Sequence, residues 1–327
     1  MEQKTILITG IGGNVGQGII RNILESKYPI RIIGTNVTDF SAGNHFVDAF
    51  YKVPFGFEPE FIPTIKKIVK LEKVDLIIPS TDFESFYLSI NSKSFECSIA
   101  TAGPKATESY LDKFISWELH KRNNIPFSES ILPSFYNNNF VTAIAKPRKG
   151  RGSKGIIENI SSLNQISLLD DNDYIIQKMH RGLEITTAAY VSYKSKKLLG
   201  IITMERSLES GATTYCKVIR EYDTILWEIA VKITQCTDMV GSFNIQSIVD
   251  ENNVVHPFEI NCRISGTNSI RSHFGFKDVL YAIDELLYNK EIADIKTTDG
   301  IAYRYLSDVI YPFGINNGNN TDNFIVF

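Results

Sequence analysis

The sequence predicts a chain of two parts, an α/β domain with a mostly parallel sheet followed by a larger α+β region. Its length of 327 residues corresponds to about two domains at roughly 150 residues each. In the first hundred residues, apolar β-rich runs alternate with segments of helical periodicity, whereas strand-like runs dominate from Phe140 onward. Turn residues at Ala102-Gly103-Pro104 separate the two patterns. We therefore expect domains at 1–103 and 104–310 and a polar C-terminal tail at 311–327.

The first domain is expected to alternate strands with helices. Strands are predicted at Lys4–Thr9, Pro29–Asn36, Val74–Pro79 and Ser98–Thr101. Helices are predicted at Asn14–Ser26 and Phe61–Leu71, where apolar residues recur at helical spacing. Strands separated by helices imply right-handed crossovers and hence parallel pairing.

The second region is expected to begin with a helix at Asp112–Asn124, opened by an acidic residue and ended before Pro126. Strands then follow at Val141–Lys146, Gly155–Glu158, Tyr174–Met179, Glu184–Tyr193, Leu198–Glu205, Ser242–Val249 and Val254–Asn261. Two further helices are predicted at Asp223–Thr237 and Lys277–Leu287. This order is typical of an α+β architecture rather than of a second doubly wound sheet.

Composition excludes several functional classes. Lys and Arg total 34 against 37 for Asp and Glu, a net charge of -3, which argues against a generally basic nucleic-acid binder. No apolar run approaches the ~18–20 residues that span a bilayer, and the N-terminus does not resemble a signal peptide. The four cysteines show no paired metal or redox spacing. We expect a cytoplasmic protein of enzyme size without nucleic-acid or membrane partners.

A glycine-rich segment, Thr9 to Gly16, follows the first strand and opens the first helix. Such a turn presents main-chain N–H groups to an anion and is found in dinucleotide-binding domains. An NAD(P)-dependent sugar epimerase or reductase is therefore one alternative. Those enzymes use a tyrosine and a lysine four residues apart on a helix, but the only match, Tyr190 and Lys194, lies in a predicted strand, where the two would stand ~13 Å apart.

A basic glycine loop follows the strand that ends at Lys146. Between Lys146 and Gly155 the chain carries three glycines and four further basic residues. Glycine frees main-chain N–H groups to wrap phosphate oxygens, and Lys146 supplies a fixed positive charge. A solvated basic hairpin is the alternative interpretation of this segment.

Two weaker signals flank this loop. The strand Tyr174–Met179 ends in polar residues at a chain turn, an arrangement that suits the edge of an adenine ring, although an ordinary strand end looks the same. Asp112-Lys113 opens the predicted helix, where an exposed lysine is common.

A hairpin around Asn252-Asn253 carries the strongest signal. In a two-residue turn, Gln246 would lie opposite Glu259, and the period of two places Glu259, Asn261 and Arg263 on one face. A carboxylate and two amide oxygens are hard ligands suited to Mg²⁺, and an arginine suits phosphate. If the loop has four residues, Asn244 takes the place of Gln246.

Taken in this order, the motifs resemble the ATP-grasp superfamily, and within it single-unit proteins similar to the large subunit of carbamoyl-phosphate synthase. The resemblance covers roughly residues 1 to 310, and its most specific part is Glu259-x-Asn261-x-Arg263 with Gln246 upstream. It implies a Rossmann-like pre-ATP-grasp domain followed by an ATP-grasp fold, with a small lid subdomain at about 112–180. Many family members carry a carboxylate in place of Gln246 and a glutamate in place of Gln177.

The resemblance also implies a role for each matching residue. The nucleotide phosphates would be held by Lys113, Lys146 and the loop residues Lys149, Gly150, Gly152 and Ser153. The adenine would be bordered by Gln177, Lys178 and Met179, and the ribose bonded by Glu184. Mg²⁺ or Mn²⁺ would be held by Gln246, Glu259 and Asn261. The catalytic charges on the transferring group would be Lys146 and Arg263.

The implied activity is an ATP- and Mg²⁺-dependent ligase that joins a small carboxylate to an amine through an acyl phosphate. Carbamoyl-phosphate synthesis itself needs two such units, and this chain has one. Candidate contacts to the carboxylate and amine substrates line the predicted space between the domains: Asp82, Glu84, Arg206, Asn268 and Arg271. A homodimer is also expected. An ATP-binding protein without catalysis is the remaining alternative.

Overall fold

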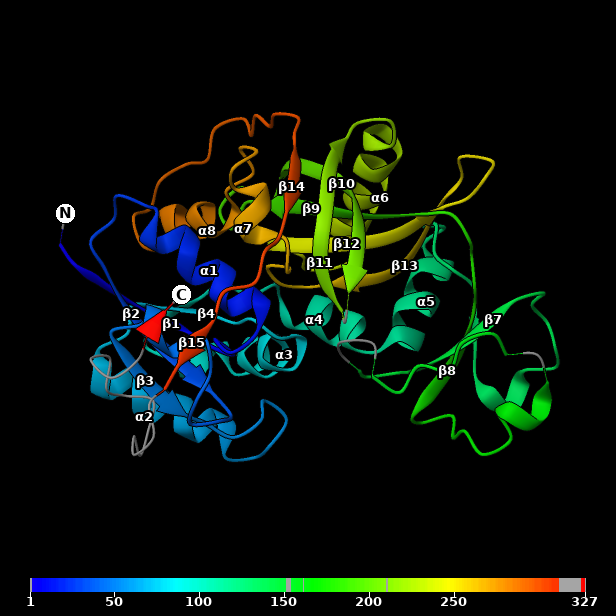
Figure 1. Ribbon diagram of the computed structural model, residues 1–327, viewed down its shortest axis with the longest axis horizontal. Helices are drawn as coiled ribbons and strands as arrows, with labels where there is room; N and C mark the ends of the chain where they lie inside the picture. Colours follow the sequence, from blue (N-terminus) through cyan, green and yellow to red (C-terminus); the bar gives the residue numbers. More distant parts are fainter. Residues whose placement is uncertain (1, 151–153, 161, 210, 312–324, 327) are drawn as a thin grey trace.

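The N-terminal part of the chain forms a parallel sheet in the order β3-β2-β1-β4-β5 (Figure 1). The computed structural model describes residues 2–150, 154–160, 162–209, 211–311 and 325–326. The sheet's strands are β1 (Lys4–Ile8), β2 (Ile30–Asn36), β3 (Ala49–Lys52), β4 (Leu76–Ile78) and β5 (Ser98–Ile99). Its connecting helices are α1 (Asn14–Leu24), α2 (Phe61–Glu72) and α3 (Asp82–Ile90).

Both faces of this sheet are covered, which explains its almost continuous apolar strands. Ile6 and Ile8 pack on one face with α1 and with α8 (Asp278–Leu286), which comes from the far end of the chain. Leu7 and Ile77 pack on the other face with α2. Strand order and two-sided covering are those of a doubly wound α/β sheet, as the alternating pattern predicts.

The second part of the chain is built on a six-stranded antiparallel sheet in the order β13-β12-β9-β10-β11-β14. Its strands are β9 (Leu183–Val191), β10 (Leu198–Glu209), β11 (Ala212–Ile219), β12 (Gly241–Val249), β13 (Val255–Asn261) and β14 (Ile301–Tyr303). Helix α6 (Asp223–Cys236) packs on one face, against Ala189 and Phe243. Phe276 and Tyr281 pack on the other, against Ala188 and Tyr190.

A three-stranded sheet, β6-β8-β7, lies at the end of the molecule farthest from the N-terminal sheet (Figure 1). Its strands are β6 (Ser130–Ile131), β7 (Ala143–Pro147) and β8 (Tyr174–Lys178). Two helices, α4 (Pro104–Leu111) and α5 (Lys113–Arg122), connect it to the rest of the chain. The Asp112 carboxylate caps α5 by accepting from the N–H groups of Phe114 and Ile115, at 2.9 and 3.3 Å.

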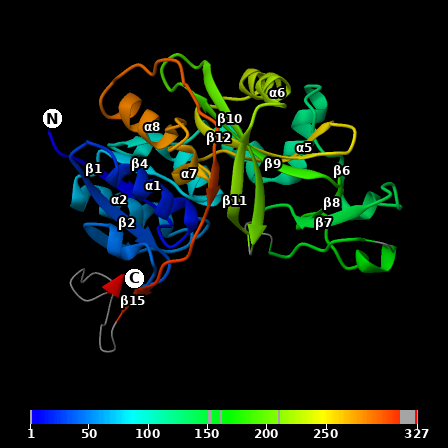
Figure 2. The ribbon, with the colours of Figure 1, turned by 45° about the horizontal axis from the view of Figure 1, so that its top comes forward.

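After α7 (Asn268–Arg271) and α8, the chain adds β14 to the edge of the six-stranded sheet and then crosses beside α1 (Figure 2). It ends in a two-stranded sheet of β15 (Val309–Ile310) and β16 (Ile325–Val326). Most of the predicted tail, residues 312–324, lies outside the described residues. Among the helices that are described, none is long and apolar enough to cross a membrane.

One predicted strand is wrong and several elements were not expected. Gly155–Glu158 makes a single bridge, Ile157 to Ala145, because Gly155 and Asn159 have positive φ angles of 74° and 55° and turn the chain out of the sheet. Elements that the sequence pattern did not reveal are β3, α3, α4, β6, β11, α7, β14, β15 and β16.

The β12–β13 hairpin has the predicted pairing with a different turn. Val249 pairs with Val255, so five residues, 250–254, connect the two strands, and Asn253 takes the left-handed conformation with φ 60°. A bulge at Phe258 then shifts the register by one, which places Gln246 opposite Glu259 and Asn244 opposite Asn261. The turn shifts the strand register by one residue from the predicted pairing, and the bulge shifts it back, so Gln246 still lies opposite Glu259.

Candidate functional site

A cavity of about 180 Å³ lies between the three-stranded sheet and the six-stranded sheet. Six of the thirteen predicted nucleotide and metal residues contribute to its wall, although they come from α5, β7 and the loop after it, β9, β12 and β13. Its lining consists of Lys113, Ile144, Lys146, Pro147, Gly150, Lys154, Ile156, Glu184, Leu208, Gln246, Phe258 and Glu259. The fold therefore gathers cations, amides and carboxylates from distant segments around one space.

Lys146 is the most buried cation of this cavity, with 8% of its surface exposed. Its Nζ donates to Gln177 Oε1 at 2.8 Å and lies 4.6 Å from the centroid of the Phe258 ring. Burial lowers the pKa of Lys146 to about 8; the negative charge of Glu259 opposes this shift, and the positive charge of Lys113 adds to it. A lysine in this state has a strong electrostatic preference for a nearby anion.

Gln177 faces inward from β8 and is 1% exposed. Besides accepting from Lys146, its amide donates to Ser130 Oγ at 3.1 Å and to the Phe258 carbonyl at 3.5 Å. Its side chain therefore fixes Lys146. It does not lie at an open strand end, where the sequence predicted that it would border an adenine ring.

Lys178 and Met179, the other two residues predicted to border the adenine, differ in the hydrogen bonds of their main-chain groups. Met179 donates its N–H to the Thr142 carbonyl and accepts from Thr142 Oγ1, so both of its main-chain groups are bonded within the protein. Lys178 is exposed, and its N–H donates to the Glu129 carbonyl. The predicted adenine contact through Met179 would require Thr142 to give up these bonds.

The three predicted metal ligands form a connected row with the predicted substrate residue Arg206. We call this row the site chain: Arg206, Gln246, Asn261 and Glu259. Gln246 Nε2 donates to Asn261 Oδ1 at 3.0 Å, and Asn261 Nδ2 donates to Glu259 Oε1 at 2.9 Å. Burial raises the pKa of Glu259, but the positive charges of Lys113 and Lys146 outweigh it and leave the pKa below its ordinary value. Glu259 is therefore held as a carboxylate.

Arg206 belongs to the site chain rather than to a separate substrate surface. From β10 its guanidinium donates to Glu184 Oε1 at 2.6 Å and to Gln246 Oε1 at 2.9 Å. The ion pair with Glu184 is only partly exposed, at 10% for the arginine and 29% for the carboxylate. Arg206 thus joins the predicted ribose ligand to a predicted metal ligand.

The donor set of the site chain fits a hard divalent cation. It offers the Glu259 carboxylate and the side-chain oxygens of Gln246 and Asn261, which are ligand types that Mg²⁺ accepts. The described residues contain no group of three or more His, Cys, Asp and Glu side chains that could hold a metal. A cation here would depend on amide oxygens, on one carboxylate and on oxygens of a bound ligand.

Arg263 follows Asn261 and reaches across to the N-terminal domain. Its Nε and one terminal nitrogen both donate to Asp82 Oδ2, at 3.1 and 2.8 Å, and the other terminal nitrogen donates to the Ile264 carbonyl. Asp82 opens α3, directly after β4. Two predicted residues, one for catalysis and one for substrate, therefore form an ion pair between the domains.

The basic loop after Lys146 is anchored at its start. Arg148 forms an ion pair with Asp112 at 2.8 Å, and its carbonyl accepts from the Lys113 N–H. Lys149 is exposed, whereas Gly150 and Lys154 line the cavity. The predicted phosphate-binding residues Gly152 and Ser153 lie outside the described residues.

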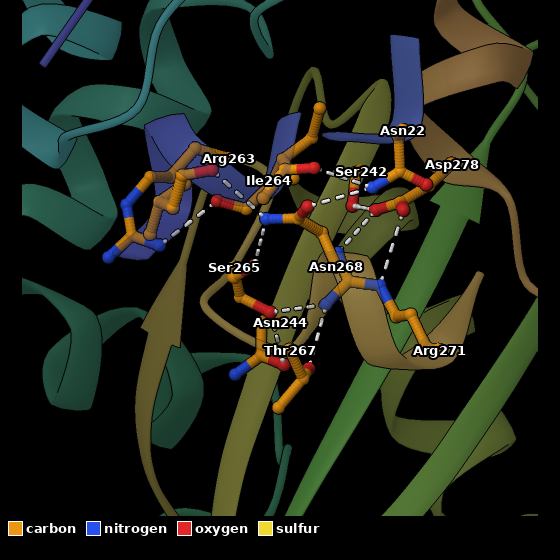
Figure 3. A network of polar contacts seen from close by, with 12 residues as sticks. Asn22, Ser242, Asn244, Arg263, Ile264, Ser265, Thr267, Asn268, Arg271 and Asp278 are labelled. Carbon is orange, nitrogen blue, oxygen red and sulfur yellow. Dashed lines mark hydrogen bonds and ion pairs between the residues drawn. The ribbon is translucent and has the colours of Figure 1, made fainter. Parts of the chain in front are cut away.

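Two predicted substrate residues lie in a buried polar cluster, the closed network, formed by Asn22, Ser265, Asn268, Arg271 and Asp278 (Figure 3). Arg271 is fully buried, donates to both Asp278 oxygens and donates to Ser265 Oγ at 2.7 Å. Asn268 accepts from Asn22 and donates to the Val15 and Ser265 carbonyls. The protein itself occupies these donors and acceptors, which argues against the predicted substrate contacts.

Glu84 is occupied in the same way. It is 6% exposed, and its carboxylate accepts from Thr9 Oγ1 at 2.8 Å and from Thr81 Oγ1 at 2.7 Å. Of the predicted substrate residues, only Asp82 and Arg206 therefore stand next to other residues of the predicted site.

Some cavity residues were not predicted. Phe258 provides the ring beneath Lys146, Leu208 adds an apolar wall from β10, and Ile144 and Ile156 add two more apolar side chains. Phe258 directly precedes Glu259, so the hairpin motif was adjacent to it, but its direction depends on the bulge. Leu208 carried no recognisable sequence signal.

No protein-family model matches this sequence, and no curated protein matches it. Solved structures do resemble it. N5-carboxyaminoimidazole synthetase from Staphylococcus aureus aligns with a TM-score of 0.72 at 14% identity, over 91% of this chain and 81% of that chain. Biotin carboxylase from Campylobacter jejuni, in complex with β-γ-ATP, aligns with a TM-score of 0.71 at 16% identity, over 96% and 81%.

A third similar structure is carboxyaminoimidazole ribonucleotide synthase from Aspergillus clavatus complexed with ATP, with a TM-score of 0.72 at 14% identity over 91% of this chain and 81% of that chain. Two of the three structures, the biotin carboxylase and the ribonucleotide synthase, were solved with an adenine nucleotide bound. The mixed α/β architecture, with one parallel sheet and several antiparallel sheets, is shared with them. At this level of identity, the similarity concerns the fold.

Proposed function

We propose that this protein is an ATP- and Mg²⁺-dependent ligase that joins a small carboxylate to an amine. One observation carries the proposal: Lys146, Glu184, Gln246 and Glu259 converge on a single cavity, in a fold shared with ATP-dependent ligases. A buried cation beside a carboxylate and an amide is suited to a nucleotide phosphate and its metal. The motif from Glu259 to Arg263 with Gln246 is what favours a single-unit protein of the carbamoyl-phosphate-synthase type.

The same proposal assigns parts of the chain to roles. Residues 1–103 form the pre-ATP-grasp domain and 104–310 the ATP-grasp domain, with a lid at about 112–180 and a tail at 311–327. The lid's β7–β8 sheet supplies Lys146, and the six-stranded sheet supplies the site chain. The cavity between them is then the nucleotide site.

Two steps account for the reaction. A carboxylate oxygen of the substrate attacks the γ-phosphorus of ATP, and the bond from that phosphorus to the ADP oxygen breaks. The amine nitrogen then attacks the acyl carbon, phosphate leaves with the electrons of the C–O bond, and the nitrogen loses a proton. No nucleophile from the protein is required.

The residues of the site act by charge and position. Lys146 places one positive charge at the transferring group, and Gln177 and Phe258 keep that charge in place. Arg263, released from Asp82 by an anionic substrate, would neutralise the acyl phosphate. Gln246, Glu259 and Asn261 would hold Mg²⁺, whose chemistry here is charge neutralisation on phosphate oxygens.

The position of Tyr190 argues against the epimerase or reductase alternative, which needs this residue as its catalytic tyrosine. Tyr190 is fully buried in β9, and its hydroxyl donates to Glu285 at 2.7 Å. Desolvation raises its pKa far above the ordinary value. A phenol in that setting does not exchange a proton with a substrate.

A screen for ADP release tests the proposal. Wild-type protein is incubated with ATP, Mg²⁺ and pairs of small carboxylates and amines, and ADP is measured for each pair. We expect at least one pair to release ADP, and Glu259→Ala to abolish this turnover. Glu251→Ala removes an exposed carboxylate from the turn of the same hairpin and should leave it intact. Nucleotide binding without ADP release from any pair would favour a binding protein instead.

A further inference from the structure

A second cavity, of about 670 Å³, lies between α1, α7 and the segment that follows β14. It shares no lining residue with the cavity around Lys146. Its volume falls within the range of about 300–1,000 Å³ that is typical of small-molecule sites. The nucleotide site proposed above does not account for it.

Two arginines face this cavity without an acidic partner. Arg21 lies in the last turn of α1, and Arg304 follows β14. None of the ion pairs between described residues involves either of them. Burial lowers the pKa of Arg304, and the positive charge of Arg21 lowers it further. Two like charges therefore line the same cavity.

The walls around these arginines are aromatic and polar. The Arg21 guanidinium lies 5.4 Å from the centroid of the Phe46 ring, which also lines the cavity together with Tyr305. Glu25 is the one acidic residue in the described lining, and its carboxylate lies 3.7 Å from His273 Nε2. The described lining of the cavity thus combines two guanidinium groups and several aromatic rings with a single carboxylate.

We propose that this cavity binds a small organic anion, a carboxylate or a phosphate ester on a ring-shaped body, between Arg21 and Arg304. Arginine binds both anions through paired N–H donors, and an anion between two guanidinium groups relieves their repulsion. The aromatic side chains provide the surface for the rest of the ligand. This site is separate from the proposed nucleotide site and does not depend on it.

Arg304 connects this cavity to the segment that carries Arg263. Arg304 donates to the Gly266 carbonyl at 2.9 Å, and Gly266 lies three residues after Arg263. An anion bound to Arg304 would therefore also influence the position of the loop that leads from the site chain to α7. The same chemistry fits an acid substrate of the ligase and an effector that is not consumed.

Calorimetric titration without nucleotide tests the site, with phenyl phosphate, benzoate and inorganic phosphate as probes. We expect saturable binding of phenyl phosphate at one site, weakened at least about tenfold by Arg21→Gln and by Arg304→Gln. Arg122→Gln removes an exposed arginine from α5 and should not change the affinity, and Lys146→Ala should not either. Circular dichroism of each variant verifies folding.

Two results would overturn the proposal. One is the absence of saturable binding with all three probes. The other is binding that survives Arg21→Gln and Arg304→Gln but is lost in Lys146→Ala, which would locate the anion at the nucleotide cavity. Once a reacting acid is known, Arg304→Gln distinguishes an acid substrate from an effector. If the KM for that acid rises at unchanged kcat, the anion bound here is the substrate. If the anion changes the ADP affinity but is not itself consumed, it is an effector.

Discussion

The site chain and the closed network use the same kinds of side chain and differ in what surrounds them. In the closed network, every guanidinium nitrogen of Arg271 has a partner within the protein, and the side chain is fully buried. In the site chain, Gln246 and Glu259 line a cavity, and Glu259 keeps a charge stabilised by lysines across that space. Polar clusters that are complete in themselves support the fold, whereas those that border a cavity remain available for a ligand.

The two clusters also connect different parts of the molecule. The closed network joins α1, from the start of the chain, to α7 and α8, from its far end. The site chain joins strands of one sheet and faces the three-stranded sheet across the cavity. Substitutions in the first should therefore change stability, and substitutions in the second should change ligand binding.

The largest effect is expected from Arg271→Met. It leaves the buried Asp278 carboxylate without its partner, so the free energy of unfolding should fall by about 3–5 kcal/mol in urea denaturation. Arg206→Met, in the site chain, should cost only about 1–2 kcal/mol. Equal losses in the two variants would remove the distinction between the clusters.

Gly18→Ala should have the next largest effect. A Cβ at Gly18 would lie 2.5 Å from Asn268 Oδ1 and push α1 away from the closed network, which we expect to lower the free energy of unfolding by about 2 kcal/mol. Gly266→Ala is the matched control, because nothing lies within 4 Å of a Cβ there, and its stability should not change measurably. Similar denaturation midpoints for both variants would contradict the close contact between α1 and Asn268.

A pH profile tests the charge of Lys146. Its pKa of about 8 means that the ammonium form is present at pH 7 and lost as pH rises through 8; Lys113, Glu158, Glu184 and Glu259 are the charged groups that influence it. ADP affinity measured by calorimetry should therefore fall about tenfold per pH unit above 8. Lys146→Arg keeps its charge and should show a flat profile. If the ADP affinity of the wild-type protein does not change up to pH 9.5, the pKa of Lys146 is not about 8.

Arg206→Gln should have the smallest effect. Removing the guanidinium frees Gln246 Oε1 and takes a positive charge away from the metal ligands, so Mn²⁺ should bind about threefold more tightly in the presence of ADP. Electron paramagnetic resonance of free Mn²⁺ measures this affinity. Arg220→Gln, at an exposed ion pair, is the control. Weaker Mn²⁺ binding in Arg206→Gln would show that the arginine organises the metal ligands instead of competing with them.

Local pattern was sufficient for much of the fold and for the order of the motifs. Alternating strand and helix signals predicted the N-terminal sheet, and the acidic cap predicted α5. The pairing of Gln246 with Glu259 was predicted from a two-residue turn, although a five-residue connection and a bulge at Phe258 produce it. These features depend on residues that are near in sequence or in direct register.

What the sequence could not predict depends on burial and on contacts between distant segments. Arg206 and Arg271 look alike as residues, and only the tertiary structure places one beside a cavity and the other within a closed network. Gln177 was expected at a hinge because β8 ends after it, but its alternation along the strand directs it to Lys146. The pair of Arg21 and Arg304 arises because the chain after β14 returns to α1.

The most direct test of the central claim is a calorimetric titration of ADP, with and without Mg²⁺, into the wild-type protein and into Lys146→Ala. We predict one binding site per chain, tighter with Mg²⁺ than without it, and an affinity at least about tenfold lower in the variant. Equal affinity in both proteins, or binding that is indifferent to Mg²⁺, would contradict a nucleotide site built from Lys146 and the site chain.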